Sequence, residues 1–475
     1  MRILILSAFF SISATAVSAQ QTWNLKTIVD YAMKNNIGVK QTEVQARIQA
    51  LTLKQSKLSQ YPNASFALSG SFNNGNNQDP VTFERINTSF VQAGLQLQTS
   101  ADIFNFYSKR NTIAANEWEL KAAIANVGKI QNDIALSAAN AYLQILLAIE
   151  QEKITKVQVA QTTEQLNNTR KQVQAGTLPE LNLVQLEAQL ALDSVNYINA
   201  KGAITQSVLT LKTFMNVDAA APFEVETPPV ESIPLEPMSD LQPDIVYQQA
   251  LTNQPLQQVN AFRIKAAEKT KAAAKGAMYP SLSAFGNFGS RYNNQGRYVV
   301  GSTLVSPPLG NVEIGGVKYS VFPLEPYNVP SYSKRSLPGQ LGDNFNQGVG
   351  LSLNVPIFNA GTLRTNYEKS KLNIDNLELQ KLSDDQKLKQ DIYQAHNAAV
   401  IALEKFNASK KSVYSSQQTY DFANKRFEVG MLNTFDLITT QNNLLRAKLE
   451  YTINQFDYVF KMKVLEFYKG LGLKL

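Results

Sequence analysis

The spacing of apolar side chains changes along the chain from every second residue to every third or fourth residue. In residues 64–72, Phe66, Leu68 and Phe72 alternate with serine and alanine. Such alternation predicts a β-strand with one apolar face and one small polar face. The pattern recurs three more times, most loosely in the third segment, so four strands are expected, near residues 64–73, 89–99, 282–292 and 347–357.

The longest helical pattern runs from about residue 105 to residue 173 without a proline. Ile130, Ile134, Ala138 and Ala141 follow one another at intervals of three or four, which predicts one buried stripe on a helix. At about 1.5 Å per residue this helix would be about 100 Å long, so it would project instead of covering a globular core. Alanine in the stripe predicts close helix packing, as in a coiled coil closed into a tube.

The second half of the chain repeats the first half. Residues around Gly176 align without a gap to residues around Gly430, at an offset of 254 residues. Nearer the start the offset is 218 residues, because Tyr61 aligns with Tyr279, so the second copy contains an insertion of 36 residues. An internal duplication of this kind predicts that the chain folds as two similar structural units. Further aligned pairs are Leu178 and Leu432, Leu183 and Leu437, Tyr197 and Tyr451, and Ile103 and Ile357.

The duplication divides the chain into two structural repeats and a linker. The first repeat covers residues 20–215 and the second covers residues 244–475, and each contains two strands, a long helix and a helical hairpin tip, near Gly176 and Gly430. Proline and acidic residues fill the linker at residues 216–243, which predicts irregular structure. The insertion near residues 295–343 is expected to be an extracellular loop, with an additional pair of strands as the alternative.

The beginning of the chain has the pattern of an export signal. Residues 1–19 contain Arg2, an apolar run and the small residues Val17, Ser18 and Ala19. This order is typical of a cleaved signal peptide, and an N-terminal core helix is the alternative. The chain has no cysteine, so neither a disulfide nor a lipid-anchoring thiol is expected.

Composition and charge exclude several classes of function. The 475 residues carry a net charge of +7 and only 17% are charged, with basic residues dispersed along the helices and no interleaved aromatics, so no nucleic-acid partner is expected. His396 is the only histidine. A catalytic triad or a histidine-rich metal site would depend on that single imidazole, and no phosphate-binding glycine motif is present. We therefore expect a protein that is not an enzyme and binds no metal or cofactor.

The strands have the length and polarity of strands in an outer-membrane β-barrel. About nine to eleven alternating residues cross a tilted barrel wall. Glutamine, serine, asparagine and glycine stand opposite the apolar set and suit a water-filled lumen. A face of a soluble β-sandwich is the alternative. Four strands cannot close a barrel, and an open edge in lipid leaves backbone groups without partners, so three chains that pool twelve strands are the simplest solution.

With these features the chain resembles the TolC family of outer-membrane efflux channels over essentially all of its length after the signal. The resemblance is carried by the two tips, Val173 to Leu183 and Arg426 to Leu437, by the motif Val355 to Asn359 and by the Tyr-Pro pairs. It implies a mainly α fold with β: a homotrimeric 12-stranded barrel in the outer membrane, continuous with a long periplasmic α-helical barrel. It also implies a periplasmic adaptor and an inner-membrane transporter of the RND, ABC or MFS type as partners, besides outer-membrane lipid.

The resemblance assigns the two tips to adaptor contact. The residues concerned are Ala175, Gly176, Thr177 and Leu178 in the first tip and Arg426, Val429, Gly430, Met431 and Leu432 in the second. Glycine permits the turn, and apolar side chains exposed there would await a partner. The alternative is that these side chains fold back as caps within the chain.

The resemblance also places a constriction of the periplasmic entrance one turn beyond the second tip. Three copies of Asp436 would form a ring selective for cations. Thr439 stands where a second acid can occur in the family, and Asn182 occupies the equivalent position of the first copy, so the ring would hold one acid per chain. Alternatively, Asp436 is a first-turn residue favoured by the helix dipole.

Together these features predict a passive exit duct in the cell outer membrane. It would export small molecules, such as drugs, metals or other toxic compounds, as the outer-membrane channel of a tripartite efflux system. A type I protein-secretion duct is the alternative within the same class. A soluble periplasmic helical scaffold is the alternative from another class.

Overall fold

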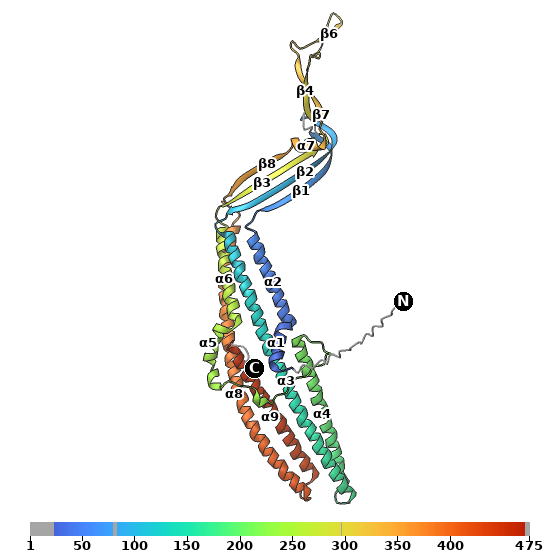
Figure 1. Cartoon of the computed structure of the whole chain (residues 1–475), viewed down its shortest axis with the longest axis vertical. Helices are drawn as coiled ribbons and strands as arrows, with labels where there is room; N and C mark the ends of the chain where they lie inside the picture. Colours follow the sequence, from blue (N-terminus) through green and yellow to red (C-terminus); the bar gives the residue numbers. More distant parts are fainter. Residues whose placement is uncertain (1–22, 79–82, 296, 471–475) are drawn as a thin grey trace, which may run out of the picture. The chain divides into compact units, whose positions relative to one another are not determined.

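The computed structural model describes residues 23–78, 83–295 and 297–470 of the chain (Figure 1). The predicted signal peptide at residues 1–19 lies outside the described residues. The chain forms two compact units. We call the described parts of Met1–Leu51, Glu117–Ala266 and Asn373–Leu475 the helical unit, and Thr52–Asn116 with Ala267–Leu372 the sheet unit.

The sheet unit contains a four-stranded antiparallel sheet in the order β1-β2-β3-β8. Its register brings like residues together, since Phe66 lies opposite Leu97 and Leu97 lies opposite Phe288, while Ser65 lies opposite Gln98. One face is therefore mainly apolar and the other mainly polar, with Phe285 as an exception on the polar face. Strands β1 and β8 each have one neighbour in the chain, so the sheet has two open edges. The strands are β1 (Asn63–Gln78), β2 (Arg85–Phe104), β3 (Ser281–Asn293) and β8 (Asn346–Asn354).

The insertion of the second repeat folds into strands and a short helix instead of a loop. Two antiparallel pairs form, β4 with β7 and β5 with β6. Gly315 and Gly316 join β5 to β6 with φ angles of +62° and +83°, which suits the turn of a two-residue hairpin. The elements are β4 (Arg297–Val305), β5 (Gly310–Ile314), β6 (Val317–Val321), β7 (Tyr327–Lys334) and α7 (Leu337–Asp343).

Helices form most of the remaining described residues, and the two longest have 67 residues each. Helix α1 begins at Asn24, whose side chain accepts a hydrogen bond from the Thr27 N–H at 2.9 Å. Two 3₁₀ turns, Val230–Ser232 and Met238–Leu241, interrupt the linker. The α-helices are α1 (Leu25–Asn35), α2 (Ile37–Leu58), α3 (Ser108–Gln174), α4 (Glu180–Met215), α5 (Pro243–Asn253), α6 (Pro255–Gly276), α8 (Thr362–Glu428) and α9 (Thr434–Tyr468).

Two larger apolar cores hold the helical unit together, and a third, smaller one joins Val29 of α1 to Ala135 and Ala139 of α3. In the first, Ile28 of α1 packs with Tyr142 of α3 and Leu211 of α4. In the second, Val246 of α5 packs with residues of α8 and α9 such as Met462. Burying a side chain of this size stabilises the fold by about 1.5–3 kcal/mol. Each larger core thus joins a short helix, a long helix and a helix that follows a tip.

Among the described helices, α3 alone contains an 18-residue window with a mean hydropathy as high as 1.2. Half of this window is buried inside the protein. By length and hydropathy this helix could cross a membrane, but a helix in the core of a water-soluble protein can have the same length and hydropathy. The apolar window of α3 is accounted for by the first core, to which Ala138, Tyr142 and Ile145 belong.

Candidate functional site

Both helical hairpin tips end their first helix with the same hydrogen-bond motif. At the first tip the N–H of Gly176 donates to the Val173 carbonyl at 3.0 Å, and the N–H of Thr177 donates to the Gln172 carbonyl at 2.9 Å. This pair of bonds is a Schellman motif, and it requires the left-handed backbone that Gly176 adopts at φ +73°. In Figure 1 the α3–α4 turn and the α8–α9 turn lie at the same end of the helical unit.

The second tip repeats this geometry. Gly430 has a φ of +75°, and its N–H donates to the Phe427 carbonyl at 2.9 Å. The N–H of Met431 donates to the Arg426 carbonyl at 2.8 Å. Carbonyl groups at the C-terminal ends of α3 and α8 are thereby paired within the chain. The backbone of each turn is therefore fixed without a partner protein.

The side chains of the tips divide into two groups. The Thr177 hydroxyl donates to the Gln172 carbonyl at 2.9 Å, and the Arg426 guanidinium donates to the Met431 carbonyl at 3.5 Å, so these two fold back onto their own turns. Val429 and Met431 are each 68% exposed. Ala175 is exposed as well, while Leu178 and Leu432 are half-buried. The tips therefore combine internal caps with exposed apolar surface.

Asp436 takes part in the cap of α9. Its backbone N–H donates to the Asn433 Oδ1 atom at 2.8 Å, and the Asn433 side-chain amide donates to the Asp436 carboxylate at 2.8 Å. This reciprocal arrangement pairs two groups at the helix start. The Asp436 side chain stays exposed, so its charge remains available to solvent or to further copies of the chain.

The other two residues expected at the entrance are placed by local bonds. The Thr439 hydroxyl donates to the Phe435 carbonyl at 2.8 Å. The N–H of Asn182 donates to the Pro179 carbonyl at 3.1 Å, in the first turn of α4. Thr439 is exposed and Asn182 is half-buried.

A buried polar cluster around Asp193 joins helices that form the two tips, and it was not predicted from the sequence. Asp193 of α4 is 1% exposed and accepts hydrogen bonds from the Thr162 hydroxyl at 2.6 Å and the Gln189 amide at 2.8 Å. Gln189 also exchanges bonds with Asn442 at 3.1 and 3.2 Å, and the Gln441 amide donates to Thr162 at 3.1 Å. The cluster joins α3, α4 and α9, and its hydrogen bonds offset the cost of burying these polar groups.

One signal in the sequence could have revealed this cluster. Thr155, Gln158, Thr162 and Thr169 are all buried on α3, at spacings that continue the apolar stripe of the same helix. A polar residue in phase with an apolar stripe is expected to find a buried partner. Such a stripe indicates polar contacts between helices, but it does not identify the partner helix.

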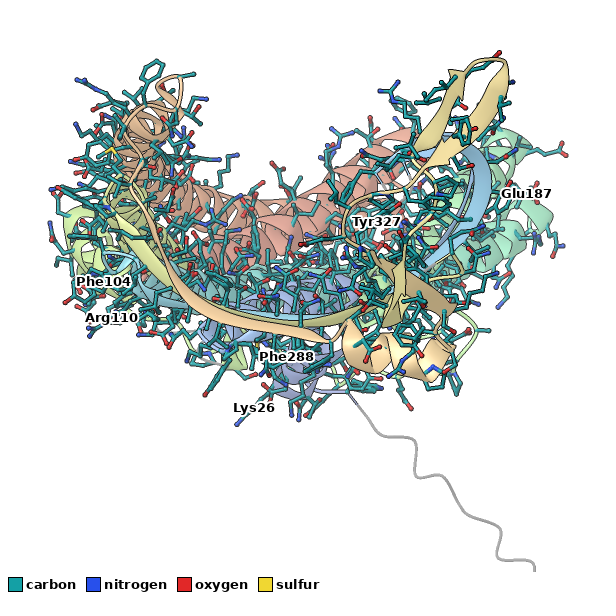
Figure 2. The ribbon with its side chains drawn as sticks, turned by 90° about the horizontal axis from the view of Figure 1, so that it is seen from above. Lys26, Phe104, Arg110, Glu187, Phe288 and Tyr327 are labelled. Atoms are coloured by element: carbon teal, nitrogen blue, oxygen red, sulfur yellow. The ribbon has the colours of Figure 1, made fainter. Side chains whose placement is uncertain are left out.

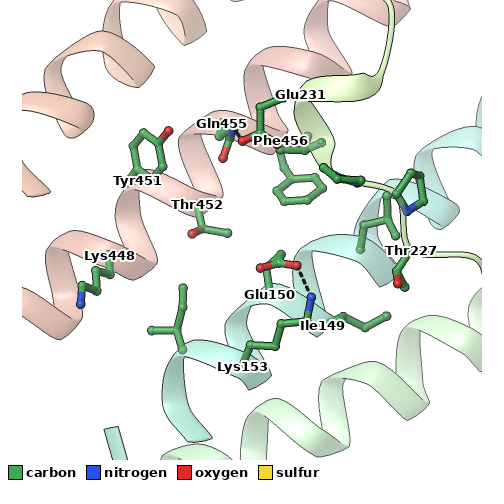
Figure 3. A pocket seen from close by; sticks show the side chains of 15 residues that line it. Ile149, Glu150, Lys153, Thr227, Glu231, Lys448, Tyr451, Thr452, Gln455 and Phe456 are labelled. Carbon is green, nitrogen blue, oxygen red and sulfur yellow. Dashed lines mark hydrogen bonds and ion pairs between the residues drawn. The ribbon is translucent and has the colours of Figure 1, made fainter. Parts of the chain in front are cut away.

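A cavity of about 410 Å³ lies between α3, α9 and the linker residues 227–231 (Figure 3). Lys153 and Glu150 form an ion pair of 2.6 Å on one side, and the Gln455 amide donates to Glu231 at 2.8 Å on another. Burial and, secondly, the nearby Glu231 carboxylate raise the pKa of Tyr451 above the ordinary value of a phenol. The lining thus offers charges of both signs beside apolar side chains.

No group of three or more His, Cys, Asp or Glu side chains that could hold a metal ion occurs among the described residues. The polar groups that do come together are the tip caps, the cluster around Asp193 and the lining of the cavity. Their arrangement suits helix positioning and contact with other molecules.

A family model and the relatives found by sequence comparison all point to outer membrane efflux proteins. The family model for outer membrane efflux proteins matches residues 29–217 and 246–458. The toluene efflux pump outer membrane protein TtgC of Pseudomonas putida is 23% identical over 346 residues, which cover 71% of this chain and 60% of that relative. The outer membrane efflux protein BepC of Brucella suis is 21% identical over 428 residues, which cover 90% of this chain and 81% of that relative.

A solved structure shares the fold. The CmeC outer membrane channel of Campylobacter jejuni matches with a TM-score of 0.71 and 19% sequence identity, over 95% of this chain and 86% of that chain. At this identity the likeness concerns the fold, which is mostly helical with some sheet. With TtgC the match spans less than two thirds of the relative's own length.

Proposed function

Because this chain belongs to the outer membrane efflux protein family, we propose that it is the outer-membrane channel of a tripartite efflux system. It is a passive exit duct through which small toxic molecules leave the cell. The family predicted from the sequence is confirmed. Two curated relatives are named for toluene and antibiotic efflux, and those names support a small-molecule cargo for this chain.

The observation that carries the proposal is a four-stranded sheet with one exposed apolar face and two open edges. Phe66, Leu68 and Val349 are 67%, 75% and 82% exposed. An apolar face of this kind suits lipid, but open edges in lipid leave backbone N–H and C=O groups without partners. Three chains that join β1 of one copy to β8 of the next make a closed barrel of twelve strands in the outer membrane. Its polar face then surrounds a water-filled lumen.

The helical unit supports the same threefold assembly. Each chain contributes two tips with the same closing motif and two cores of similar composition, as expected for an internal duplication. Three chains then present six tips, which match a hexameric periplasmic adaptor, and form one α-helical barrel in the periplasm. The adaptor-contact residues are Ala175, Gly176, Thr177 and Leu178 with Arg426, Val429, Gly430, Met431 and Leu432. An inner-membrane transporter supplies the energy for export.

The entrance to the duct lies just beyond the second tip. Three exposed Asp436 carboxylates around the threefold axis form a ring that favours cations. Thr439 and Asn182 complete the constriction without adding charge. The hydrogen bond from Asn433 holds the Asp436 side chain at the start of α9, and because the Asn433 amide is neutral it leaves the carboxylate charge uncompensated.

The direct test is electrical recording from the purified chain. We expect the protein in the outer-membrane fraction, as a trimer in detergent, with stepwise cation-preferring conductance in planar bilayers. A deletion strain is expected to become sensitive to toxic small molecules. A monomer in the periplasmic fraction would instead support a soluble helical scaffold. Loss of a secreted protein without any change in drug sensitivity would support type I protein secretion.

A further inference from the structure

Basic residues concentrate where three helices of the sheet unit adjoin the strands. Residues 52–58 of α2, 108–116 of α3 and 267–276 of α6 together contain seven Lys or Arg residues and a single Glu. Lys54, Arg110 and Lys275 are exposed, and within the described part of the chain none of the three forms an ion pair. We call these three residues the basic collar. Its charge is not neutralised by the neighbouring side chains.

The three helix segments are held together at their ends by contacts through α3. The Lys109 ammonium donates to the Ser59 carbonyl at 2.6 Å, which joins α3 to the end of α2. The Ser108 hydroxyl donates to the Ala273 carbonyl at 2.9 Å, which joins α3 to α6. Gly276 packs so closely on α3 that an added Cβ atom would lie 2.7 Å from the Phe106 carbonyl oxygen. These contacts fix the helix ends that carry the three cations.

An exposed aromatic cluster lies between the collar and the sheet. The rings of Phe106 and Tyr279 stack with centroids 4.8 Å apart, and Phe104 lies 5.0 Å from Phe106 and 5.8 Å from Tyr107. All four side chains are exposed. Phe106 and Tyr107 have φ angles of +45° and +61°, a left-handed backbone that bulky residues rarely adopt. The chain thus accepts backbone strain at the position where it exposes these rings.

The dimensions of this region match those of a membrane interface. Aromatic belts mark the level of lipid headgroups. Arg110 lies two residues into α3 and Lys275 lies one residue before the end of α6, so both cations are within about 5 Å, one helical turn, of the helix ends that adjoin the rings. The headgroup layer of one leaflet is about 5–7 Å thick. Figure 2 labels Phe104 and Arg110 on the same side of the view from above.

We propose that the basic collar binds the phosphate groups of anionic phospholipids in the leaflet next to the helices. The inference rests on the proposed placement of the sheet in the outer membrane. Charge complementarity selects this occupant, because an exposed uncompensated set of cations beside an aromatic belt attracts a negatively charged lipid surface. The phosphates anchor the helix ends α2, α3 and α6 at a fixed depth. They thereby hold the barrel wall and the helices in register with the membrane.

The test compares lipids of different charge on the purified, detergent-extracted trimer. Phosphatidylglycerol is expected to raise the thermal unfolding temperature, while phosphatidylcholine leaves it unchanged, and added salt weakens the effect because it screens charge. The triple variant Lys54→Gln, Arg110→Gln, Lys275→Gln is expected to bind phosphatidylglycerol about 100-fold more weakly, since each cation contributes about a factor of five. Inorganic phosphate at the same concentration is expected to give no stabilisation.

A matched triple variant controls for loss of charge alone. Lys156→Gln, Lys201→Gln and Lys410→Gln remove three exposed lysines of the helical unit and are expected to leave the lipid effect unchanged. Equal stabilisation by both lipids, an equal loss in the control, or full competition by inorganic phosphate would overturn the proposal. The outer-membrane fractionation and the conductance are measured in parallel. A conducting trimer without lipid preference refutes the collar alone, whereas a soluble monomer refutes the proposed function.

Discussion

At the scale of single residues, Asp436 combines two roles that a suitable substitution separates. Its carboxylate accepts from Asn433 in the cap of α9, and three copies would also place a negative ring at the entrance. Asp436→Asn keeps a side-chain oxygen that can accept the Asn433 bond but removes the charge. We expect this variant to lose cation preference in single-channel recordings, with nearly unchanged thermal stability.

Asp436→Ala provides the comparison. It keeps the bond from the backbone N–H to Asn433 but removes the carboxylate that accepts from Asn433, together with the charge. It is expected to cost about 0.3–1 kcal/mol of helix stability, because first-turn acids contribute on that scale. Unchanged cation preference in both variants would show that Asp436 acts only in the helix cap and not in an entrance ring. Thr439→Ala is a suitable control, because its hydroxyl is bound to the Phe435 carbonyl and carries no charge.

At the scale of elements, the two Schellman turns depend on left-handed glycines. Gly430→Ala places a Cβ atom at φ +75°, where an L-residue costs about 1–2 kcal/mol. Gly202 lies inside α4 with open space around it, so Gly202→Ala is expected to stabilise the chain by about 0.5–1 kcal/mol. Chemical unfolding of the two variants checks the opposite signs. Equal effects would show that the second tip does not require its left-handed turn in solution.

The sequence revealed the helices, the strands and the family, but it showed little of how side chains pair between elements. Alternation of Phe66, Leu68 and Phe72 indicated a strand directly, because period two is a local property of the chain. In contrast, β1 continues to Gln78 through asparagines that carry no apolar signal, and it does so because β2 pairs with them. The strands β4 to β7 were foreseen only as the alternative of an additional strand pair, because glycines and prolines interrupt their pattern.

For the candidate site, too, the sequence predicted the local turns but not the contacts between helices. Gly176 and Gly430 indicated the turns, since a glycine after a helical pattern is a local signal. The contacts of Asp193 with Thr162 and Gln189 were not predicted, because Thr162 lies on another helix and its distance from Asp193 is set by packing. The proposed entrance ring and the proposed adaptor contacts would involve further chains, so neither the sequence nor the fold of one chain displays them.

At the scale of the whole molecule, the assignment of the sheet faces decides between a membrane barrel and a soluble sandwich. Leu351 lies opposite Ala284 on the apolar face, and Ser352 lies opposite Ser283 on the polar face of β8. In a trimeric barrel Leu351→Lys places a charge in lipid, at a cost of about 2–4 kcal/mol in each chain near the bilayer midplane. Ser352→Lys places the same charge in a water-filled lumen.

We therefore expect Leu351→Lys to reduce the amount of trimer extracted from the outer membrane. Ser352→Lys is expected to assemble normally and to weaken the cation preference of the channel. A sandwich core would also reject lysine at position 351, so a third variant is needed. Leu351→Trp suits a lipid-facing surface and keeps the trimer, whereas a close-packed core would be destabilised by the larger ring by about 1–3 kcal/mol. Loss of assembly with tryptophan would therefore favour a packed face, because lipid accommodates the ring and a fixed core does not.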